Sequence, residues 1–297
     1  MVDVIARRGS HASPLRYPGG KATLAGFFES TIQALGLNLP TYVEPYAGGA
    51  GAGLELLVKG VVGTVVINDL DPAIHACWRA MLKESDAFLR LLSRTPLTVE
   101  EWKKQRAVYR RRHEFDVDPL ALGFATFYLN RTSRSGVLGA GVIGGIAQGG
   151  PYKIDARYDK AVLRARIERL ALLSGKIRVT RQDGVARLRE YLPKDNVFAY
   201  VDPPYVEKGS TLYMSSFEEG DHAELAAVLN GRWNTNWVLT YDVAPLIKRL
   251  YRAREVSEFR LLYSAHLRGE KDGLKRREAK ELIVFSDPVA AALDKRR

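Results

Sequence analysis

The segment Asp202-Pro203-Pro204-Tyr205 places a carboxylate, two rigid prolines and an aromatic ring in a row. An exocyclic amine of a nucleic-acid base is a poor nucleophile, because its lone pair is delocalised into the ring. Asp202 and a proline carbonyl can accept hydrogen bonds from such an amine. Because proline fixes its own φ angle, the segment can present that carbonyl in a rigid geometry. Tyr205 can stack on a base that has left a duplex. The segment is therefore suited to aiming an amine at an electrophilic methyl group; a rigid turn with a surface aromatic is the alternative.

A glycine-rich turn from Glu44 to Gly53 follows a short apolar segment. Glycines lack a Cβ atom, so a ligand can approach the backbone where a strand ends and a helix begins. Asp69 ends the next apolar segment about 20 residues later, a spacing at which a carboxylate accepts hydrogen bonds from ribose hydroxyls. The combination predicts a cofactor that contains a nucleoside. The alternative is a tight turn with a helix-capping aspartate.

The spacing of the glycines bears on which cofactor binds. Gly49, Gly51 and Gly53 form G-x-G-x-G, whereas the dinucleotide fingerprint is G-x-G-x-x-G. This spacing disfavours a pyrophosphate and so opposes a nicotinamide-dependent oxidoreductase, the rival from another enzyme class. S-adenosylmethionine has no phosphate and needs close approach to the backbone, so we expect it as the cofactor.

Short apolar segments that alternate with helical patterns must position these residues. The alternation predicts an α/β fold, a doubly wound Rossmann-like sheet. Asp71-Pro72 is typical of a helix start before Ala73–Leu82, and Asp221 with Glu224 resembles a capping box before Leu225–Leu229. The predicted strands are Tyr42–Glu44, Thr64–Asn68, Ile177–Thr180, Val197–Val201, Trp237–Thr240 and Glu281–Phe285.

The pattern changes between Thr98 and Lys176, where a basic run, a helix around Leu120–Leu129 and the glycine-rich segment Gly136–Gly150 occur. We expect an inserted, mostly helical subdomain over 98–176, whose glycine-rich loop settles on a partner. An ordinary surface insertion is the alternative. The flanking parts, 1–97 and 177–297, are expected to form the cofactor-binding and catalytic parts of one domain.

Composition narrows the class of protein. With 297 residues and 46% hydrophobic content, the chain can bury a sizeable core. Forty-five Lys and Arg against thirty-four Asp and Glu give a net charge of +11, which is typical of a partner for a polyanion. The single cysteine, Cys77, excludes an intramolecular disulfide and a cysteine-rich zinc site and favours a cytoplasmic location. We expect neither a membrane span nor a metal.

The order of these motifs resembles that of the Dam-type (D12 class) adenine-specific DNA N6-methyltransferases, from Pro14 to about Phe285. The segment from Leu15 to Lys21 is similar to the family's N-terminal motif, and the segment from Leu129 to Gly136 resembles its Asn-Arg segment. The resemblance implies an S-adenosylmethionine-dependent enzyme that flips an adenine out of double-stranded DNA and methylates N6, with the insertion recognising the target. Gly136–Gly150 departs from the Dam pattern, so the recognition sequence stays open.

The resemblance also implies roles for individual residues. The catalytic residues are Asp202, Pro203, Pro204 and Tyr205. The cofactor-binding residues are Tyr17, Lys21, Glu44, Tyr46, Ala47, Gly48, Gly49, Asp69 and Asp183. Basic side chains expected on DNA, where they neutralise phosphates without reading sequence, are Arg110, Arg112, Arg131, Arg134, Lys275 and Arg276. Asn130 is expected on DNA through the resemblance of its segment. A solvated charged face is the alternative for the basic residues.

Two other functions compete. Methylation of cytosine N4 or of RNA needs the same chemistry, and Asp rather than Ser at position 202 favours adenine through the resemblance alone. A catalytically inactive, basic DNA-binding protein is the non-enzymatic alternative. The intact segment from Asp202 to Tyr205 argues against it, because binding phosphates does not require that segment.

Overall fold

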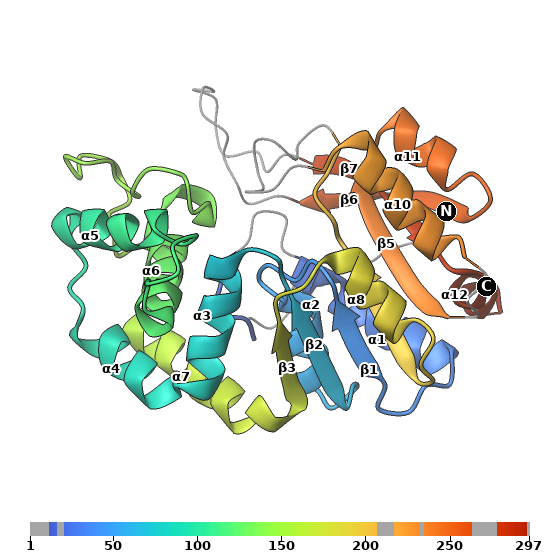
Figure 1. Ribbon diagram of the computed structural model, residues 1–297, viewed down its shortest axis with the longest axis horizontal. Helices are drawn as coiled ribbons and strands as arrows, with labels where there is room; N and C mark the ends of the chain where they lie inside the picture. Colours follow the sequence, from blue (N-terminus) through green and yellow to red (C-terminus); the bar gives the residue numbers. More distant parts are fainter. Residues whose placement is uncertain (1–11, 17–20, 207–216, 232–234, 263–277, 296–297) are drawn as a thin grey trace.

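The computed structural model describes residues 12–16, 21–206, 217–231, 235–262 and 278–295. Its centre is a seven-stranded sheet with helices on both faces (Figure 1). The order of the strands across the sheet is β3-β2-β1-β4-β5-β7-β6. The strands are β1 (Thr41–Glu44), β2 (Thr64–Asn68), β3 (Ile177–Thr180), β4 (Val197–Val201), β5 (Asn236–Asp242), β6 (Glu255–Leu262) and β7 (Glu278–Phe285).

Five neighbouring strands, β3, β2, β1, β4 and β5, are parallel, whereas β7 pairs antiparallel with β5 and with β6. Parallel strands place their carboxyl ends at one edge of the sheet. The antiparallel β7 instead brings its amino-terminal half to that edge, where Glu281 is the register partner of Asp242. The predicted doubly wound α/β fold is confirmed.

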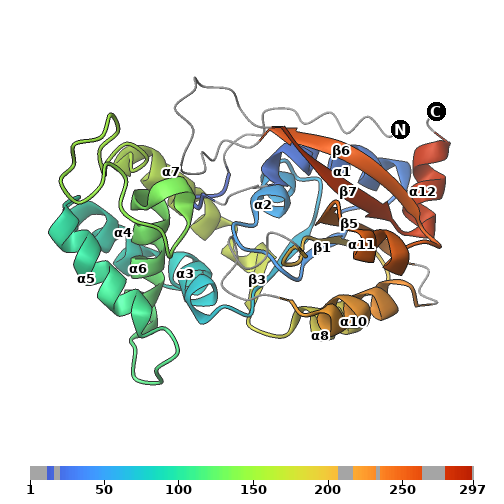
Figure 2. The ribbon, with the colours of Figure 1, turned by 90° about the horizontal axis from the view of Figure 1, so that it is seen from above.

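Helices cover the two faces in separate layers (Figure 2). On one face lie η1 (Lys21–Leu24), α1 (Ala25–Ala34), α2 (Gly51–Val58), α3 (Pro72–Lys83) and α12 (Asp287–Asp294). On the other lie α8 (Gly184–Tyr191), α10 (Glu219–Leu229) and α11 (Pro245–Leu250). Neighbouring strand residues alternate between the two cores, as Tyr42 and Val43 do. This burial on both faces is what near-continuous apolar strands require.

A group of helices extends from one end of the sheet, at the left in Figure 1. It contains α4 (Ser85–Arg94), α5 (Val99–Arg110), α6 (Pro119–Thr132), η2 (Arg134–Gly136), α7 (Lys160–Leu172) and η3 (Ser174–Lys176). α6 packs against α3 and α5, while α7 packs against α3 and α4. Because α4 precedes Thr98 and packs within this group, it belongs to the same helical body; the division at 98 and 176 stays a prediction.

Each predicted strand is present, although β1, β5 and β7 are one to three residues longer than predicted, and the sequence patterns missed β6. The Asp71 cap is confirmed, because its Oδ1 accepts from the N–H of Ala73 at 2.7 Å. The prediction of a capping box formed by Asp221 and Glu224 is wrong. α10 begins at Glu219, and Asp221 accepts from the N–H of Glu218 at 2.8 Å, so the box lies three residues earlier. The polar first turn hides this start from an analysis of apolar periodicity.

Among the described residues, every helix is too short or too polar to reach across a bilayer.

Candidate active site

The candidate site lies at the carboxyl ends of β1 and β4, which are neighbours in the sheet. The strand order reverses between them, and in open α/β sheets this is where ligands bind. Glu44 ends β1 and Asp202 follows β4 directly, so the two motifs that are far apart in the sequence meet here. Asp69 and Asp183 follow β2 and β3 at the same edge.

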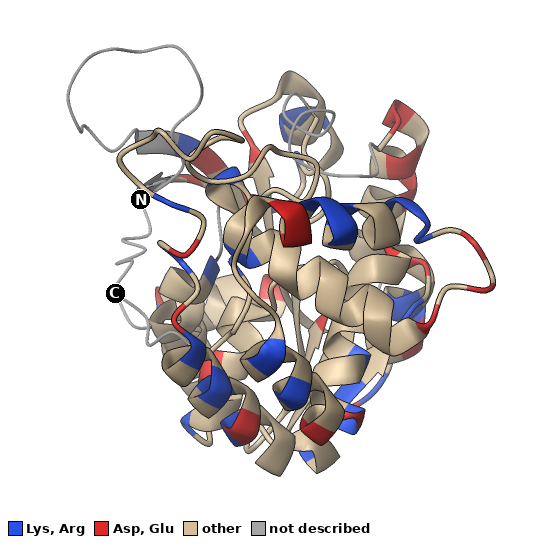
Figure 3. Cartoon of the chain, turned by 90° about the vertical axis from the view of Figure 1, so that its left-hand side faces the viewer, with Lys and Arg blue, Asp and Glu red and all other residues tan. Residues whose placement is uncertain are grey.

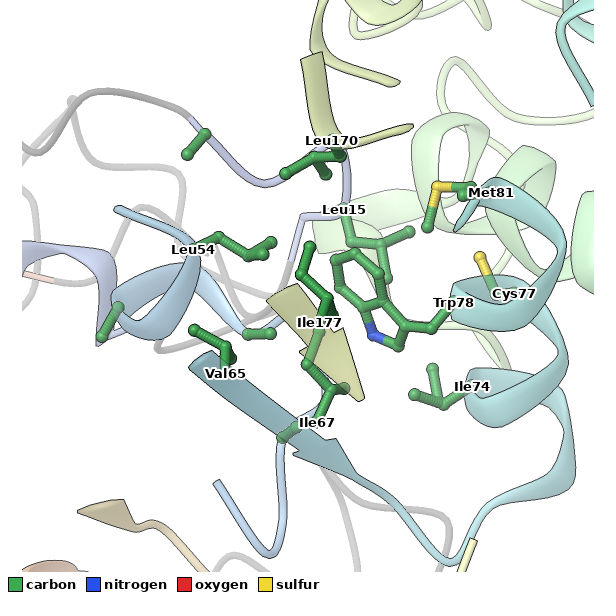
Figure 4. Close-up of a cluster of buried hydrophobic side chains, with 14 of the residues drawn as sticks. Leu15, Leu54, Val65, Ile67, Ile74, Cys77, Trp78, Met81, Leu170 and Ile177 are labelled. Atoms are coloured by element: carbon green, nitrogen blue, oxygen red, sulfur yellow. The ribbon is translucent and has the colours of Figure 1, made fainter. Parts of the chain in front are cut away.

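Hydrogen bonds hold the glycine turn in one conformation. The N–H of Gly48 donates to Oδ2 of Asp69 at 2.9 Å, and its carbonyl accepts from the indole Nε1 of Trp78 at 2.8 Å. Trp78 itself lies among Leu15, Ile177 and other apolar side chains (Figure 4). With φ of +46°, Gly48 has a backbone conformation that favours glycine. Both polar backbone groups of Gly48 are therefore used, and the turn is preorganised.

Two of the glycines serve packing inside the protein. A Cβ atom at Gly53 would lie 2.8 Å from the ring of Tyr42, and one at Gly51 would lie 3.1 Å from Cβ of Ala22. The interpretation that missing Cβ atoms admit a ligand is therefore wrong for Gly51 and Gly53, because protein atoms fill that space. Spacing alone cannot distinguish these two reasons for a glycine.

Asn68 joins the ends of three strands, a role that the sequence reasoning missed. Its Nδ2 donates to the carbonyls of Pro45 and Gln182, both at 2.9 Å. Its Oδ1 accepts from Thr180 Oγ1 at 2.8 Å and from the N–H of Gln182 at 3.0 Å. A fully buried amide thus sets the spacing between the ends of β1, β2 and β3. The available signal was an amide at the end of an apolar strand.

The two aspartates predicted for the cofactor also have local partners. Asp69 accepts from Gly48 and from the N–H of Asp71 at 3.0 Å, and burial raises the pKa of Asp69 to about 6. Asp183 is exposed and caps α8 by accepting from the N–H of Ala186 at 2.8 Å. Both carboxylates remain at the edge of the sheet where acceptors for hydroxyl and amine groups are needed.

Glu44 and Tyr46 line the end of β1. Oε1 of Glu44 accepts from the N–H of Gly53 at 3.0 Å, and burial raises the pKa of Glu44 to about 8. The neutral carboxyl therefore predominates at pH 7. The ring of Tyr46 packs directly on Gly184, where a Cβ atom would come within 2.3 Å of it. Burial raises the pKa of the Tyr46 hydroxyl.

Three donors make four contacts with the carboxylate of Asp202 and share its two oxygens unequally. Nζ of Lys21 lies 3.2 Å from both oxygens. Oδ1 also accepts from Thr240 Oγ1 at 2.7 Å and from the Tyr205 hydroxyl at 3.3 Å. Thr240 in turn lies 2.8 Å from the hydroxyl of Tyr200. Among the described residues only Lys21 contacts Oδ2, so the 18% exposed side chain keeps one oxygen with spare acceptor capacity.

Lys21 is held between two carboxylates. Its Nζ lies 3.3 Å from Oε2 of Glu281, which is completely buried, and it donates to the Tyr205 hydroxyl at 2.7 Å. Burial lowers the pKa of Lys21, but Asp202 and Glu281 outweigh that effect, so the pKa lies above its ordinary value. Burial raises the pKa of Glu281. Sequence reasoning missed Glu281 and Thr240; a charged residue inside an apolar strand was the available signal for Glu281.

Tyr205 is buried, with 3% of its surface exposed, and its ring centre lies 6.2 Å from that of Tyr241. Pro203 and Pro204 are buried as well. The sequence analysis predicts that the Tyr205 ring stacks on a base. Because the ring is buried, stacking requires that the ring first be uncovered, and the stacking stays a prediction.

The residues predicted to bind DNA fall into two groups. Arg110 and Arg134 are exposed, and the guanidinium of Arg112 lies 4.8 Å from the ring centre of Tyr109. Asn130 and Arg131 are buried and hold other parts of the chain, so a DNA contact for them stays a prediction. Acidic positions are interspersed with basic ones on this end of the molecule (Figure 3). Tyr17, Lys275 and Arg276 lie outside the described residues.

Within the ranges that the structure describes, no group of His, Cys, Asp and Glu side chains is arranged to hold a metal ion.

Comparisons with known proteins agree with the motifs. A family model described as "D12 class N6 adenine-specific DNA methyltransferase" matches residues 17–269, more than half of the chain. The Type II methyltransferase M.MjaIII of Methanocaldococcus jannaschii is 24% identical over 221 residues, 70% of this chain and 73% of that protein. The structure of the rRNA methyltransferase aviRa from Streptomyces viridochromogenes covers 98% of this chain and 93% of its own, at 18% identity and a TM-score of 0.34. Because this similarity is weak, we infer nothing about the protein from it.

Proposed function

Because the chain belongs to the D12 class N6 adenine-specific DNA methyltransferase family, we propose that Asp202 and the Pro203 carbonyl orient the adenine amine for methylation. The reaction itself follows from membership: a methyl group is transferred from a methyl donor to N6 of adenine in DNA. The observation that carries the residue assignment is the unequal use of the Asp202 oxygens. Among the described residues, Oδ1 has three donors and Oδ2 has one, so Oδ2 accepts from the amine.

The residues at this edge suit S-adenosylmethionine as the donor. Asp69 and Asp183 offer carboxylates for the ribose hydroxyls and the adenine amine of such a molecule, and the turn at Gly48 offers close backbone approach. When bound, S-adenosylmethionine supplies an electrophilic methyl group on a sulfonium. The same assignment places Tyr46, Ala47 and Gly49 beside the cofactor.

Asp202 has two tasks in this assignment. Its carboxylate accepts a hydrogen bond from the amine, which localises the nitrogen lone pair, and it stabilises the positive charge that develops on that nitrogen. Lys21 and Thr240 hold the carboxylate in place before the substrate arrives. A preorganised contact of this kind contributes about a hundredfold or more to the rate. The adenine is flipped out of a duplex, and Tyr205 stacks on it once its ring is uncovered.

The test is methyl transfer from tritiated S-adenosylmethionine to duplex DNA, followed by digestion to nucleosides and chromatography. We expect the label in N6-methyladenine, and a single-turnover rate at least about a hundredfold lower for Asp202→Ala. Asp195→Ala, at an exposed position in the turn before β4, is the matched control and retains the wild-type rate. Near-normal turnover by Asp202→Ala would refute the assignment of the amine acceptor, and label in N4-methylcytosine would refute the base.

A further inference from the structure

We propose that Arg16, Arg131, Arg157 and Arg166 form a binding site for one phosphate of the DNA backbone, next to the catalytic edge. The proposal rests on the proposed function, because it takes DNA as the substrate. It adds Arg16, Arg157 and Arg166 to the residues expected on DNA and gives buried Arg131 a specific ligand.

Arg131 lies within electrostatic reach of the other three arginines, and hydrogen bonds to the backbone hold the segments that carry them. The side chain of Asn130 forms two hydrogen bonds with the backbone of Arg16. Its Oδ1 accepts from the Arg16 N–H at 2.7 Å, and its Nδ2 donates to the Arg16 carbonyl at 2.6 Å. The next residue of α6, Arg131, donates through Nε to the carbonyl of Arg157 at 2.9 Å. Arg166 of α7 donates to the carbonyl of Ser13 at 3.3 Å. The side chains of Arg131 and Arg166 and the backbones of Arg16 and Arg157 are thus held by hydrogen bonds.

In the part of the chain that the structure describes, no carboxylate pairs with this cluster. Among the described residues, the ion pairs of the protein involve none of these four arginines. Nη1 of Arg16 is buried and lacks a hydrogen-bond partner in the same residues. Burying a guanidinium without a counter-ion is costly, so the arrangement favours a bound anion.

The four arginines differ in how much of each side chain is exposed. Arg131 is 9% exposed, Arg16 and Arg166 are half-buried, and Arg157 is exposed. Burial, and after it the positive charges of Arg16, Arg166 and Arg157, lower the pKa of Arg131 to about 9. The four cations therefore repel one another in the free protein. An anion that enters past Arg157 would relieve this repulsion and meet donors already in position.

The location connects the cluster to the reaction. Arg16 lies five residues before Lys21, whose ammonium contacts Asp202, so the Cα atoms of Arg16 and Lys21 are at most about 18 Å apart. The bound phosphate therefore belongs to the part of the DNA strand close to the target adenine. Guanidinium forks match the oxygens of a phosphate, and two or more of them can share one phosphate.

A carboxylate, such as that on the amino-acid end of the methyl donor, has related chemistry. The cluster carries four positive charges, whereas the amino-acid end of the donor has an ammonium beside its carboxylate and is neutral overall. A DNA phosphate keeps its full negative charge and arrives as part of a polymer. These charges favour the phosphate.

The experiment measures DNA binding by the double variant Arg157→Gln with Arg166→Gln, both at positions with access to solvent. Arg169→Gln is the matched control, because Arg169 is an exposed arginine one turn further along α7. Fluorescence anisotropy with a labelled duplex over a range of salt concentrations gives the Kd and its salt dependence. We expect the double variant to bind about tenfold more weakly or worse. We also expect the slope of log Kd against log salt to flatten by about 0.9, the value for one lost phosphate contact.

Two results would overturn the proposal. One is a Kd and a salt slope equal to those of Arg169→Gln. The other is an unchanged salt slope with weaker binding of S-adenosylhomocysteine, which has the carboxylate and no phosphate. Melting temperatures of both variants establish that they are folded. The proposed function fails separately, if the wild-type protein binds duplex DNA but forms no N6-methyladenine; the salt slope still tests the phosphate site in that case.

Discussion

The ammonium of Lys21 lies 3.3 Å from the carboxylate of Glu281, and neither side chain is more than 5% exposed. Lys21 begins η1, whereas Glu281 lies within β7 near the other end of the chain. The same ammonium contacts Asp202, so Glu281 reaches the candidate catalytic carboxylate through Lys21. Glu281 is thus a positioning residue, and its contribution should be measurable in the stability of the protein and in turnover.

Removing Lys21 alone should be more harmful to stability than removing the pair. Lys21→Met leaves Glu281 buried beside Asp202 without a cation, which costs about 3–5 kcal/mol of unfolding free energy. Lys21→Met combined with Glu281→Gln should recover most of that loss in urea denaturation, while turnover stays low because Asp202 has lost the Lys21 ammonium that holds both of its oxygens. Additive losses in the double-mutant cycle would contradict a direct coupling.

Asn68→Ala should weaken both the fold and the cofactor site. The change removes four hydrogen bonds and leaves the carbonyls of Pro45 and Gln182 without the amide, so we expect a loss of about 2–4 kcal/mol. Thr180→Val removes one of these bonds and should cost about 1 kcal/mol. The KM for the methyl donor should rise more for Asn68→Ala, because the ends of β1 and β2 separate. Equal effects of the two variants would show that the amide does not join the strands.

Gly53→Ala and Gly26→Ala should have opposite effects, although both glycines lie in helices. A Cβ atom at Gly53 would meet the Tyr42 ring at 2.8 Å, so overpacking should cost about 1–3 kcal/mol. A Cβ atom at Gly26 would meet nothing within 4 Å, so alanine should stabilise the protein by up to about 1 kcal/mol. Thermal unfolding of the free proteins measures both. A stable Gly53→Ala variant would refute the packing explanation for this glycine.

The titration of Glu44 should appear in the pH dependence of stability. Its pKa is raised from 4.5 to about 8 in the folded protein, mainly by burial. The folded protein therefore keeps a proton that the unfolded chain has released. The stabilisation of the folded protein by this bound proton is complete below the pKa of the unfolded chain and is lost as the pH rises towards 8.

Glu44→Gln removes this titration and keeps an acceptor for the Gly53 N–H. Between about pH 5 and 8, the unfolding free energy of the wild type should fall relative to that of the variant by a few kcal/mol, since one pKa unit corresponds to about 1.4 kcal/mol. Glu29→Gln is the control at a more exposed position. Parallel profiles for the wild type and Glu44→Gln would contradict the buried titration.

Local patterns were sufficient for much of the fold. Val197–Val201 is an apolar run that ends at an acidic residue, and the same pattern recurs in Thr64–Asn68, followed by Asp69. Asp71 before Pro72 specifies a helix start through contacts within one turn. Such features depend on neighbouring residues, so they are visible in the sequence. The α10 start was misplaced because its first turn has no apolar residue that marks it.

The sequence by itself determined the α/β class, the segment from Asp202 to Tyr205 and the family, because strand, turn and capping preferences are local and the motif order is distinctive. Only the tertiary structure decided which distant groups meet. Antiparallel insertion of β7 beside β5 brings Glu281 to Lys21. Folding also brings Arg131 of α6 and Arg166 of α7 near Arg16 and Arg157, and none of the four forms an ion pair within the described residues. Those contacts follow from strand order and burial, and a charge in a sequence does not reveal whether its partner lies across the fold.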